Sequence, residues 1–122
     1  MQKVDYTIVF VSEMARSVRF YRDVLGLPLR FDSPTWTEFA TEGTTLALHL
    51  AEAGDWSRPS PPFPAASCHP GFQVGDIDEF HRKLEAQGVP CLDPPKLQDF
   101  GVKLAIYADP DGLPISISQV VQ

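Results

Sequence analysis

The sequence of 122 residues has little of three features that mark large classes of protein: cysteine, long apolar runs and positive charge. Its two cysteines, Cys68 and Cys91, form neither a CxxC pair nor a disulfide framework, so we expect reduced thiols. No apolar run approaches the roughly 20 residues that span a bilayer. The N-terminal segment MQKVDYTIVFV lacks the length and the cleavage site of a signal peptide. These absences predict a cytoplasmic protein without a membrane partner.

Positive charge is outnumbered, with 10 Lys and Arg against 16 Asp and Glu, which gives a formal net charge of −6. Nucleic acids and anionic membranes are bound through Lys and Arg patches, so we expect neither as a partner. The sequence also lacks a phosphate-binding glycine loop and a nucleophile motif. Hydrophobic residues make up 43% and charged residues 21%, which is typical of a globular domain with one sizeable core.

An internal repeat organises the chain. Residues 4–29 and 67–92 have the same order: an apolar run, an acidic residue where a helix begins, an amphipathic stretch, and a Gly-x-Pro end. The corresponding pairs are Tyr6 with His69 and Glu13 with Asp76, both 63 positions apart, and Gly26 with Gly88, 62 positions apart. The change in offset predicts one inserted or deleted residue within the helices. The two glycines suit left-handed helix ends.

Further apolar runs follow each helix, at 35–40 and 44–50 in the first half and at 96–100, 102–108 and 113–120 in the second. A proline-rich segment between the halves cannot be a central strand. Each half therefore predicts a β-α-β-β-β module. We expect an α+β fold of two tandem modules forming a cupped mixed sheet, with module one at 1–52, a linker at 53–66 and module two at 67–122.

Alternation along the strands separates two faces of the predicted sheet. We assign to the side packed on the helices Phe39, Leu46, Leu48, Leu50, Phe72, Val74, Val102, Leu104, Ile106, Ile115 and Ile117. Both sides of the first strand are apolar, so Tyr6 is placed by its correspondence with His69. The opposite side mixes aromatic, small and polar residues, which is typical of a ligand site. The predicted pocket residues on it are Tyr6, Trp36, Glu38, His49, His69, Gln73, Lys103, Tyr107 and Ser116.

Three strings in the sequence point to a known family: VSEMARSVRFYRDVLGLPL, HPGFQVGDIDEF and YADPDGLPISI. Together they resemble the vicinal oxygen chelate superfamily, which includes glyoxalase I, bleomycin resistance proteins and extradiol dioxygenases. The resemblance covers nearly the whole chain. It implies helices outside a cupped sheet, a small-molecule ligand or substrate, and a homodimer, because the cleft in this family often forms between two chains.

The resemblance also implies a metal site. In the metal-dependent members each module supplies one ligand from its first strand and one from its last. Those positions fall on Tyr6 and His49 in module one and on His69 and Ser116 in module two, so His49 and His69 are the candidate ligands for Zn, Ni, Mn or Fe. A catalytic ion generally needs three or more imidazole or carboxylate ligands, and a neutral phenol and a hydroxyl are weak donors. We therefore expect no stoichiometric metal.

Three functions are compatible with the sequence, and none of its residues is identified as catalytic. The first is a bleomycin-resistance-like protein that binds a small molecule through a degenerate metal site. The second is a metal-dependent lyase, isomerase or dioxygenase that uses His49 and His69. The third is a metal-free enzyme in which a histidine transfers a proton, with Tyr6 or Tyr107 nearby.

Other residues with chemical potential have plainer interpretations. The aromatic residues Trp36, Trp56, Phe63 and Phe100 are candidates to line a cavity for a planar ligand. The Asp-Pro-Asp-Gly segment at 109–112 predicts a turn ahead of the last strand rather than an acid pair. His81 is predicted to be an exposed helix residue.

Overall fold

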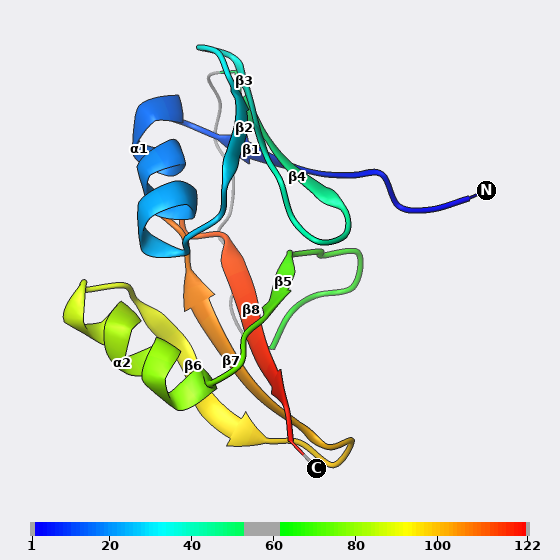
Figure 1. Ribbon diagram of the computed structural model, residues 1–122, viewed down its shortest axis with the longest axis vertical. Coiled ribbons are helices and arrows are strands. Elements are labelled where there is room, and N and C mark those ends of the chain that lie inside the picture. The colour runs from blue at the N-terminus through cyan, green and yellow to red at the C-terminus, as the bar shows by residue number, and fades with distance from the viewer. Residues whose placement is uncertain (1, 53–61, 122) are drawn as a thin grey trace. The chain divides into compact units, whose positions relative to one another are not determined.

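The computed structural model describes residues 2–52 and 62–121 (Figure 1). The chain divides into two compact units, Met1–Trp56 and Ser57–Gln122. Trp56 and most of the expected linker lie outside the described residues. None of the helices that the structure describes is long and apolar enough to cross a membrane.

The first unit is one β-α-β-β-β module. Its elements are β1 (Tyr6–Val11), α1 (Met14–Arg19), the π-helical turn η1 (Phe20–Val24), β2 (Leu29–Asp32), β3 (Trp36–Phe39) and β4 (Thr45–Leu50). The strands form a mixed sheet in the order β1-β4-β3-β2, in which β1 is parallel to β4 and the other pairs are antiparallel.

The second unit repeats this plan. Its elements are β5 (Gly71–Gln73), α2 (Ile77–Ala86), β6 (Cys91–Leu97), β7 (Val102–Ala108) and β8 (Pro114–Val120). The sheet order is β5-β8-β7-β6, again with the first and last strands parallel. The predicted α+β fold of tandem β-α-β-β-β modules is confirmed.

The one-residue difference between the two repeats lies in the first helix. The backbone N–H of Leu25 donates to the carbonyl of Phe20, five residues earlier, at 3.0 Å. This spacing is that of a π-turn, which holds one residue more than an α-turn. Both helical segments then end at a glycine in the left-handed region, Gly26 with φ of +84° and Gly88 with φ of +73°. The predicted glycine helix ends are confirmed.

The core of each unit lies between its helix and its sheet. In the first unit Val11, Phe39 and Leu48 are fully buried, and the ring of Tyr21 lies 6.2 Å from that of Phe39. In the second unit a similar layer is inaccessible to solvent: Ile77, Leu84, Ala105, Tyr107, Ile115 and Ile117. Burial of each large apolar side chain stabilises a fold by about 1.5–3 kcal/mol. Because these layers cover the helix side of each sheet, the opposite side is available to bind a ligand.

The start of α2 is held by two side chains. The carboxylate of Asp76 accepts the backbone N–H of Glu79 at 3.1 Å, as expected of a helix N-cap. The amide oxygen of Gln119, on β8, accepts the N–H of Ile77 at 2.9 Å. The corresponding residue in the first unit, Glu13, makes no such cap and forms an ion pair with Arg16 at 2.9 Å. These two contacts fasten the start of α2 to its sheet.

The turn before β8 is ordered by one buried aspartate. Asp109 is 4% exposed, and its Oδ1 accepts the backbone N–H groups of Asp111 at 2.9 Å and Leu113 at 2.8 Å. Gly112 takes a φ of +86°, which a glycine adopts without strain. The predicted turn at 109–112 is confirmed.

The strand β6 begins earlier in the chain than the apolar run at 96–100 indicates. It starts at Cys91 and contains Pro94 and Pro95, and its pairing with β7 has two register shifts. Proline has no N–H to donate, so it is tolerated in an edge strand or a bulge. β6 is an edge strand in the sheet order, which explains why a proline-rich segment is part of the sheet.

The two sides of β7 are opposite to those predicted from its sequence. Tyr107 is fully buried against α2, and the ammonium of Lys103 lies 2.7 Å from the carboxylate of Asp78 on that helix. Residues directly opposite in an antiparallel pair share a face, and Tyr107 is opposite Ile115, which is buried. The prediction that Val102, Leu104 and Ile106 pack on the helix was therefore wrong, as was the placement of Lys103 and Tyr107 across from it.

His81 is also placed differently from its prediction. Its side chain is 19% exposed, and its Nδ1 lies 2.7 Å from the phenol oxygen of Tyr107. Its Nε2 lies 3.3 Å from a carboxylate oxygen of Glu85, one helical turn further on. The prediction of an exposed helix residue was wrong, because the His81 side chain turns toward the sheet and hydrogen bonds to the hydroxyl of the buried Tyr107.

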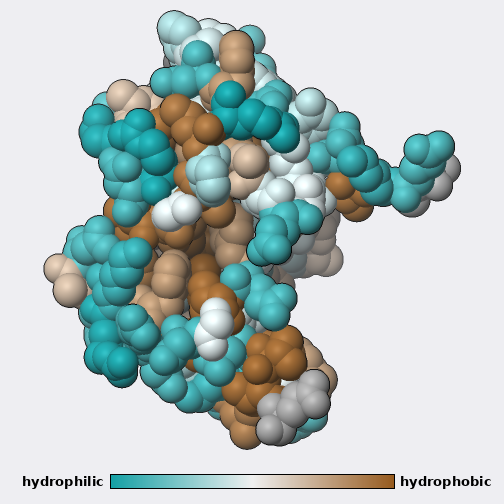
Figure 2. Space-filling model, viewed as in Figure 1, coloured by the Kyte–Doolittle hydropathy of each residue, from teal (hydrophilic) through white to brown (hydrophobic). Residues whose placement is uncertain are grey.

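Apolar side chains are also exposed at one end of the second unit. Leu97, Phe100 and Val120 are 62%, 72% and 50% exposed. Figure 2 shows hydrophobic surface in this region, where β6 and β8 end and β7 begins. Phe100 thus lies at the tip of the module.

Candidate functional site

The side of the first sheet that faces away from α1 carries an exposed aromatic surface. We call it the open face, and it consists of Tyr6, Ile8 and Phe10 on β1, Ala47 and His49 on β4, and Trp36 and Glu38 on β3. Tyr6, Ile8 and Phe10 are 45%, 44% and 62% exposed, whereas the alternating Val9 and Val11 are buried. The structure thus brings together four of the predicted pocket residues: Tyr6, Trp36, Glu38 and His49.

Ring contacts connect the aromatic residues of the open face. The rings of Tyr6 and Trp36 lie 6.1 Å apart in an edge-to-face arrangement. The ring of His49 lies 5.9 Å from that of Trp36 and 5.2 Å from that of Phe10. These distances are within the range of favourable aromatic pairs. The four rings therefore form one continuous surface across β1, β4 and β3.

A charged pair borders this surface. One carboxylate oxygen of Glu38 accepts the indole N–H of Trp36 at 2.8 Å, and the other accepts the guanidinium of Arg30 at 2.8 Å. These two donors, Trp36 first and then Arg30, hold the pKa of Glu38 below its usual range. Arg30 also donates to the hydroxyl of Thr45 at 2.7 Å. Glu38 is thus an ionised group whose charge is balanced locally.

The protonation of His49 follows from its backbone contact. Its Nδ1 lies 2.8 Å from the carbonyl oxygen of Leu50. A carbonyl oxygen only accepts hydrogen bonds, so Nδ1 carries the proton. In the neutral imidazole the exposed Nε2 is then a hydrogen-bond acceptor. His49 can accept an N–H or O–H from a molecule on the open face.

In the second unit a histidine and a serine are hydrogen bonded on the side of the sheet away from α2. The Nε2 of His69 lies 2.7 Å from the hydroxyl of Ser116, and the ring of Phe63 lies 5.1 Å from the imidazole. Burial lowers the pKa of His69, which favours the neutral ring. Gly71, opposite Ser116 in the register, has no side chain that would cover the hydroxyl. The pair can exchange a proton with a bound molecule.

Gln73 lies two residues beyond Gly71 and opposite Ser118 in the register. It is exposed and shares the side of the sheet that carries Ser116. Three of the predicted pocket residues of module two, His69, Gln73 and Ser116, therefore lie on one side of this sheet. Lys103 and Tyr107 lie on the other.

The strand registers decide which residues of the two modules correspond. Ser116 is opposite Gly71 in β5, and the equivalent of Gly71 in β1 is Ile8, which is opposite Ala47. The counterpart of Ser116 is therefore Ala47. His49 lies two residues further along β4, and its counterpart is Ser118. The sequence prediction had taken His49, two residues after Ala47, as the counterpart of Ser116.

This correspondence bears on whether the chain suits a divalent metal. The expected ligand positions hold the phenol of Tyr6, the imidazoles of His49 and His69 and the hydroxyl of Ser116, and the register equivalent of Ser116 in module one, Ala47, carries only a methyl group. Zinc, nickel, manganese and iron favour imidazole and carboxylate ligands, and a methyl group offers no donor. Within residues 2–52 and 62–121, no group of three or more His, Cys, Asp or Glu is arranged to hold a metal. The donor set does not fit the ion.

Several residues of these surfaces were not found from the sequence. Arg30 was missed because β2 could not be located as a strand, and so the hydrogen bond of its guanidinium to Glu38 on β3 was not foreseen. Ile8 and Phe10 were ambiguous because both sides of β1 are apolar. Of the other aromatic candidates, Phe63 contacts His69 and Trp56 lies outside the described part of the chain.

Comparisons with known proteins agree with this fold. Residues 3–117 match the family described as the Glyoxalase/Bleomycin resistance protein/Dioxygenase superfamily. YaeR of Escherichia coli K12, itself described as uncharacterized, is 28% identical over 127 residues, which cover 96% of this chain and 95% of YaeR.

Two solved structures show the same architecture. A glyoxalase/dioxygenase from Nostoc punctiforme is 20% identical with a TM-score of 0.85, and the match covers 99% of this chain and 92% of that one. A lactoylglutathione lyase from Agrobacterium tumefaciens is 21% identical with a TM-score of 0.74, covering 98% and 94%. At these identities the likeness extends to the fold.

Proposed function

Because the chain belongs to the Glyoxalase/Bleomycin resistance protein/Dioxygenase superfamily, we propose that it binds a small organic molecule without a catalytic metal ion. One observation supports this proposal: in the strand registers the residue equivalent to Ser116 is Ala47, which has no donor atom, and Tyr6 and Ser116 are weak donors. In the arrangement that we propose, His69 is the one imidazole. One neutral nitrogen does not retain a divalent ion against water and buffer.

The open face supports a planar, mostly apolar ligand. Tyr6, Phe10 and Trp36 offer aromatic surface, and the Nε2 of His49 offers an acceptor for one N–H or O–H of the ligand. The pair of Arg30 and Glu38 is already satisfied, so it sets an edge to the surface rather than attracting an ion. On the second unit, taken by itself, we propose His69, Gln73 and Ser116 as the residues available for ligand contact.

Metal analysis of the purified chain tests the first half of the proposal. We expect well under one equivalent of Zn, Ni, Mn or Fe, and no change in His69→Ala. About one equivalent per chain that is lost in His69→Ala would overturn the proposal in favour of a metal-dependent lyase, isomerase or dioxygenase. Ser118→Ala is the control, because it removes a polar side chain from β8, the strand that pairs with β5, at a position outside the proposed donor set.

A thermal-shift screen of small planar compounds tests the second half. A ligand present at 100 times its dissociation constant adds about 2.7 kcal/mol to the free energy of unfolding. We expect Trp36→Ala to abolish the shift and Phe100→Ala, an aromatic removed from the tip of module two, to leave it unchanged. A hit that is insensitive to Trp36→Ala and to His49→Ala would contradict binding on the open face.

The hydrogen bond between His69 and Ser116 favours a second candidate function, a metal-free enzyme. A neutral His69 can take a proton from a bound substrate while Ser116 holds the imidazole in place. Turnover of a screening hit in metal-free buffer, lost in His69→Gln while binding persists, would support it. Binding without turnover by the wild-type chain would leave the binding protein as the function.

We also propose that two copies associate, as family members do. The exposed apolar residues of the open face suit coverage by a ligand or by a second chain. Light scattering coupled to size exclusion should give twice the mass of one chain. The mass of a single chain at micromolar concentration would refute the homodimer.

A further inference from the structure

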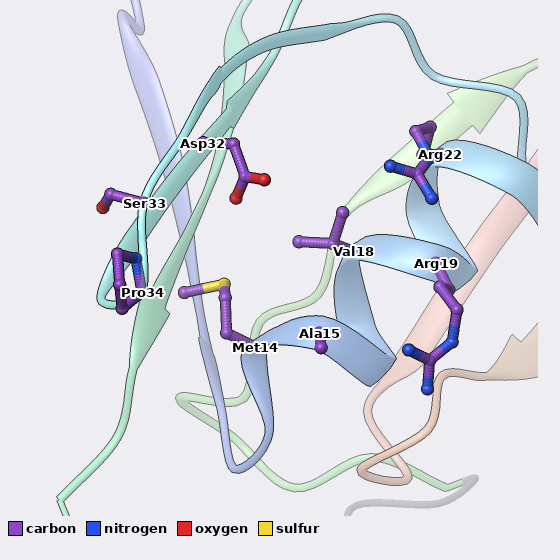
Figure 3. Close-up of a pocket in the computed structure, with 8 residues that line it drawn as sticks. All are labelled: Met14, Ala15, Val18, Arg19, Arg22, Asp32, Ser33 and Pro34. Carbon is purple, nitrogen blue, oxygen red and sulfur yellow. The ribbon is translucent and has the colours of Figure 1, made fainter.

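A groove lies on the helix side of the first sheet, away from the open face. It runs between α1 and the turn that joins β2 to β3, and its volume is about 670 Å³. Met14 and Val18 form an apolar floor, with Pro34 on the turn side (Figure 3). None of the predicted pocket residues lines it. It is therefore a separate candidate for ligand binding.

The two walls of the groove carry opposite charges. Arg19 and Arg22 come from the helical wall, and Asp32 comes from the end of β2. Figure 3 shows Arg22 and Asp32 on opposite sides of the groove, with Val18 between them. Arg22 makes its ion pair with Asp23, at 2.8 Å, and not with Asp32. The groove thus keeps a cation and an anion apart across an apolar strip.

Both charged walls keep hydrogen-bonding capacity. Asp23 accepts hydrogen bonds from the Nε and Nη2 of Arg22, so Nη1 can donate to a ligand. No hydrogen bond or ion pair within the described ranges engages Arg19. Asp32 accepts the hydroxyl of Thr37 on Oδ1 at 3.0 Å, and its Oδ2 has no hydrogen bond to another described residue. A ligand can therefore be received at either wall without breaking a contact of the fold.

The turn wall is held firmly enough to act as one side of a site. The hydroxyl of Ser33 donates to the carbonyl of Trp36 at 2.7 Å and accepts its N–H at 3.0 Å. Thr37, which is fully buried, fixes the orientation of the Asp32 carboxylate. The negative field of Asp32 contributes to raising the pKa of Arg22, after the larger effect of Asp23, so the two walls are within electrostatic reach of each other.

We propose that this groove binds a bipolar small molecule, with its ammonium at Asp32, its carboxylate at Arg22 and Arg19, and its methylene chain over Met14 and Val18. An ion of one sign would meet repulsion from the opposite wall, whereas a ligand with both charges is attracted at each end. Ω-Amino acids have this chemistry. Because exposed ion pairs contribute little individually, the affinity is weak and falls with salt.

Amide chemical-shift titration of the full chain tests the proposal with four probes: 4-aminobutyrate, 6-aminohexanoate, hexanoate and hexylamine. We expect at least one of the two amino acids to shift residues 14–22 and 32–37 saturably. Its dissociation constant should be at least tenfold lower than those of hexanoate and hexylamine at low ionic strength. Hexanoate binding as tightly as the amino acids would overturn the proposal, as would shifts scattered over the surface.

Charge-removing variants complete the test. Asp32→Asn keeps an acceptor for Thr37 and should reduce the affinity for the amino acid to that for hexanoate. Arg19→Gln combined with Arg22→Gln should reduce it to that for hexylamine. Arg82→Gln, on the exposed side of α2, is the matched control and should change nothing. Amino-acid binding that survives Asp32→Asn would refute the site, whatever the outcome at the open face.

Discussion

The imidazole Nδ1 of His81 lies 2.7 Å from the phenol oxygen of Tyr107, and this contact joins α2 to β7, a strand in the interior of the second sheet. The phenol is fully buried, and burial raises its pKa well above the usual range for tyrosine. The neutral phenol donates to His81, and the other ring nitrogen then faces Glu85 at 3.3 Å. Removing the hydroxyl leaves a half-buried nitrogen without its partner.

We expect Tyr107→Phe to lower the free energy of unfolding by about 0.5–1.5 kcal/mol, the usual net contribution of such a hydrogen bond. Urea denaturation followed by circular dichroism measures the change. Tyr6→Phe removes a hydroxyl from the exposed open face and should change the unfolding free energy by less than about 0.5 kcal/mol. Equal effects of the two substitutions would contradict a structural role for the contact between His81 and Tyr107.

The same residue should make the fold sensitive to alkaline pH. The pKa of Tyr107 is raised in the folded state. Its contribution to the unfolding free energy is therefore complete below the unfolded pKa of about 10 and declines as the pH rises above that value. We expect the unfolding free energy to fall by about 1.4 kcal/mol for each pH unit above 10 from this group. The measurement is urea denaturation at pH 9 and pH 11. A fall of the same size in Tyr107→Phe would assign the effect to other groups.

His69 should make a smaller contribution to the pH dependence of the unfolding free energy, and it should act at acidic pH. Burial lowers its folded pKa, so its contribution is complete above the unfolded pKa of about 6.5 and is lost as the pH falls through the folded value. Titration of the His69 ring protons by NMR should give a midpoint below that of an unfolded histidine. The unfolding free energy should decline between pH 7 and pH 5, and less steeply in His69→Gln. A raised midpoint would reverse the sign and contradict a neutral ring.

The π-turn can be tested by shortening it. Deletion of Asp23, an exposed residue of η1, should leave an α-helical segment with the spacing of module two, and the chain should fold with a loss of about 1–3 kcal/mol. Deletion of Arg82 from α2 is the comparison, since it rotates the following residues by about 100° and takes Leu84 out of the core. Circular dichroism and urea denaturation distinguish the two. Equal disruption would show that the π-turn does not accommodate an extra residue.

The sequence was sufficient to locate most elements, since each apolar run is bounded by glycine, proline or acidic residues. Alternation gave the correct sides for Phe39, Leu46, Leu48, Ile115 and Ile117 because each has a polar or small neighbour in the strand. In β7 both sides of the strand carry apolar or amphipathic residues, so alternation does not show which side packs on the helix. Tyr107 and Lys103 could not be placed until the pairing with β8 was known, because both hide a long apolar part and present a polar end to α2.

The candidate site shows a similar limit. Offsets within the chain paired Tyr6 with His69 correctly, because no insertion separates these positions from the start of each module. The last strand of each module lies beyond loops of different length, so the offset does not carry over to it, and the sequence prediction named His49. The hydrogen-bonded registers instead make Ala47 the equivalent of Ser116, since Ile8 is opposite Ala47 and Gly71 is opposite Ser116. The difference of two residues separates a methyl group from an imidazole.

The prolines of β6 have a consequence for the behaviour of the protein at high concentration. A sheet edge with unpaired N–H and carbonyl groups is a template on which another chain can add a strand. Neither Pro94 nor Pro95 has an N–H to offer an added strand, and the register shifts beside Asp93 make the edge irregular. Strand addition at β6 is therefore disfavoured, and replacing both prolines with threonine should make this edge more prone to it.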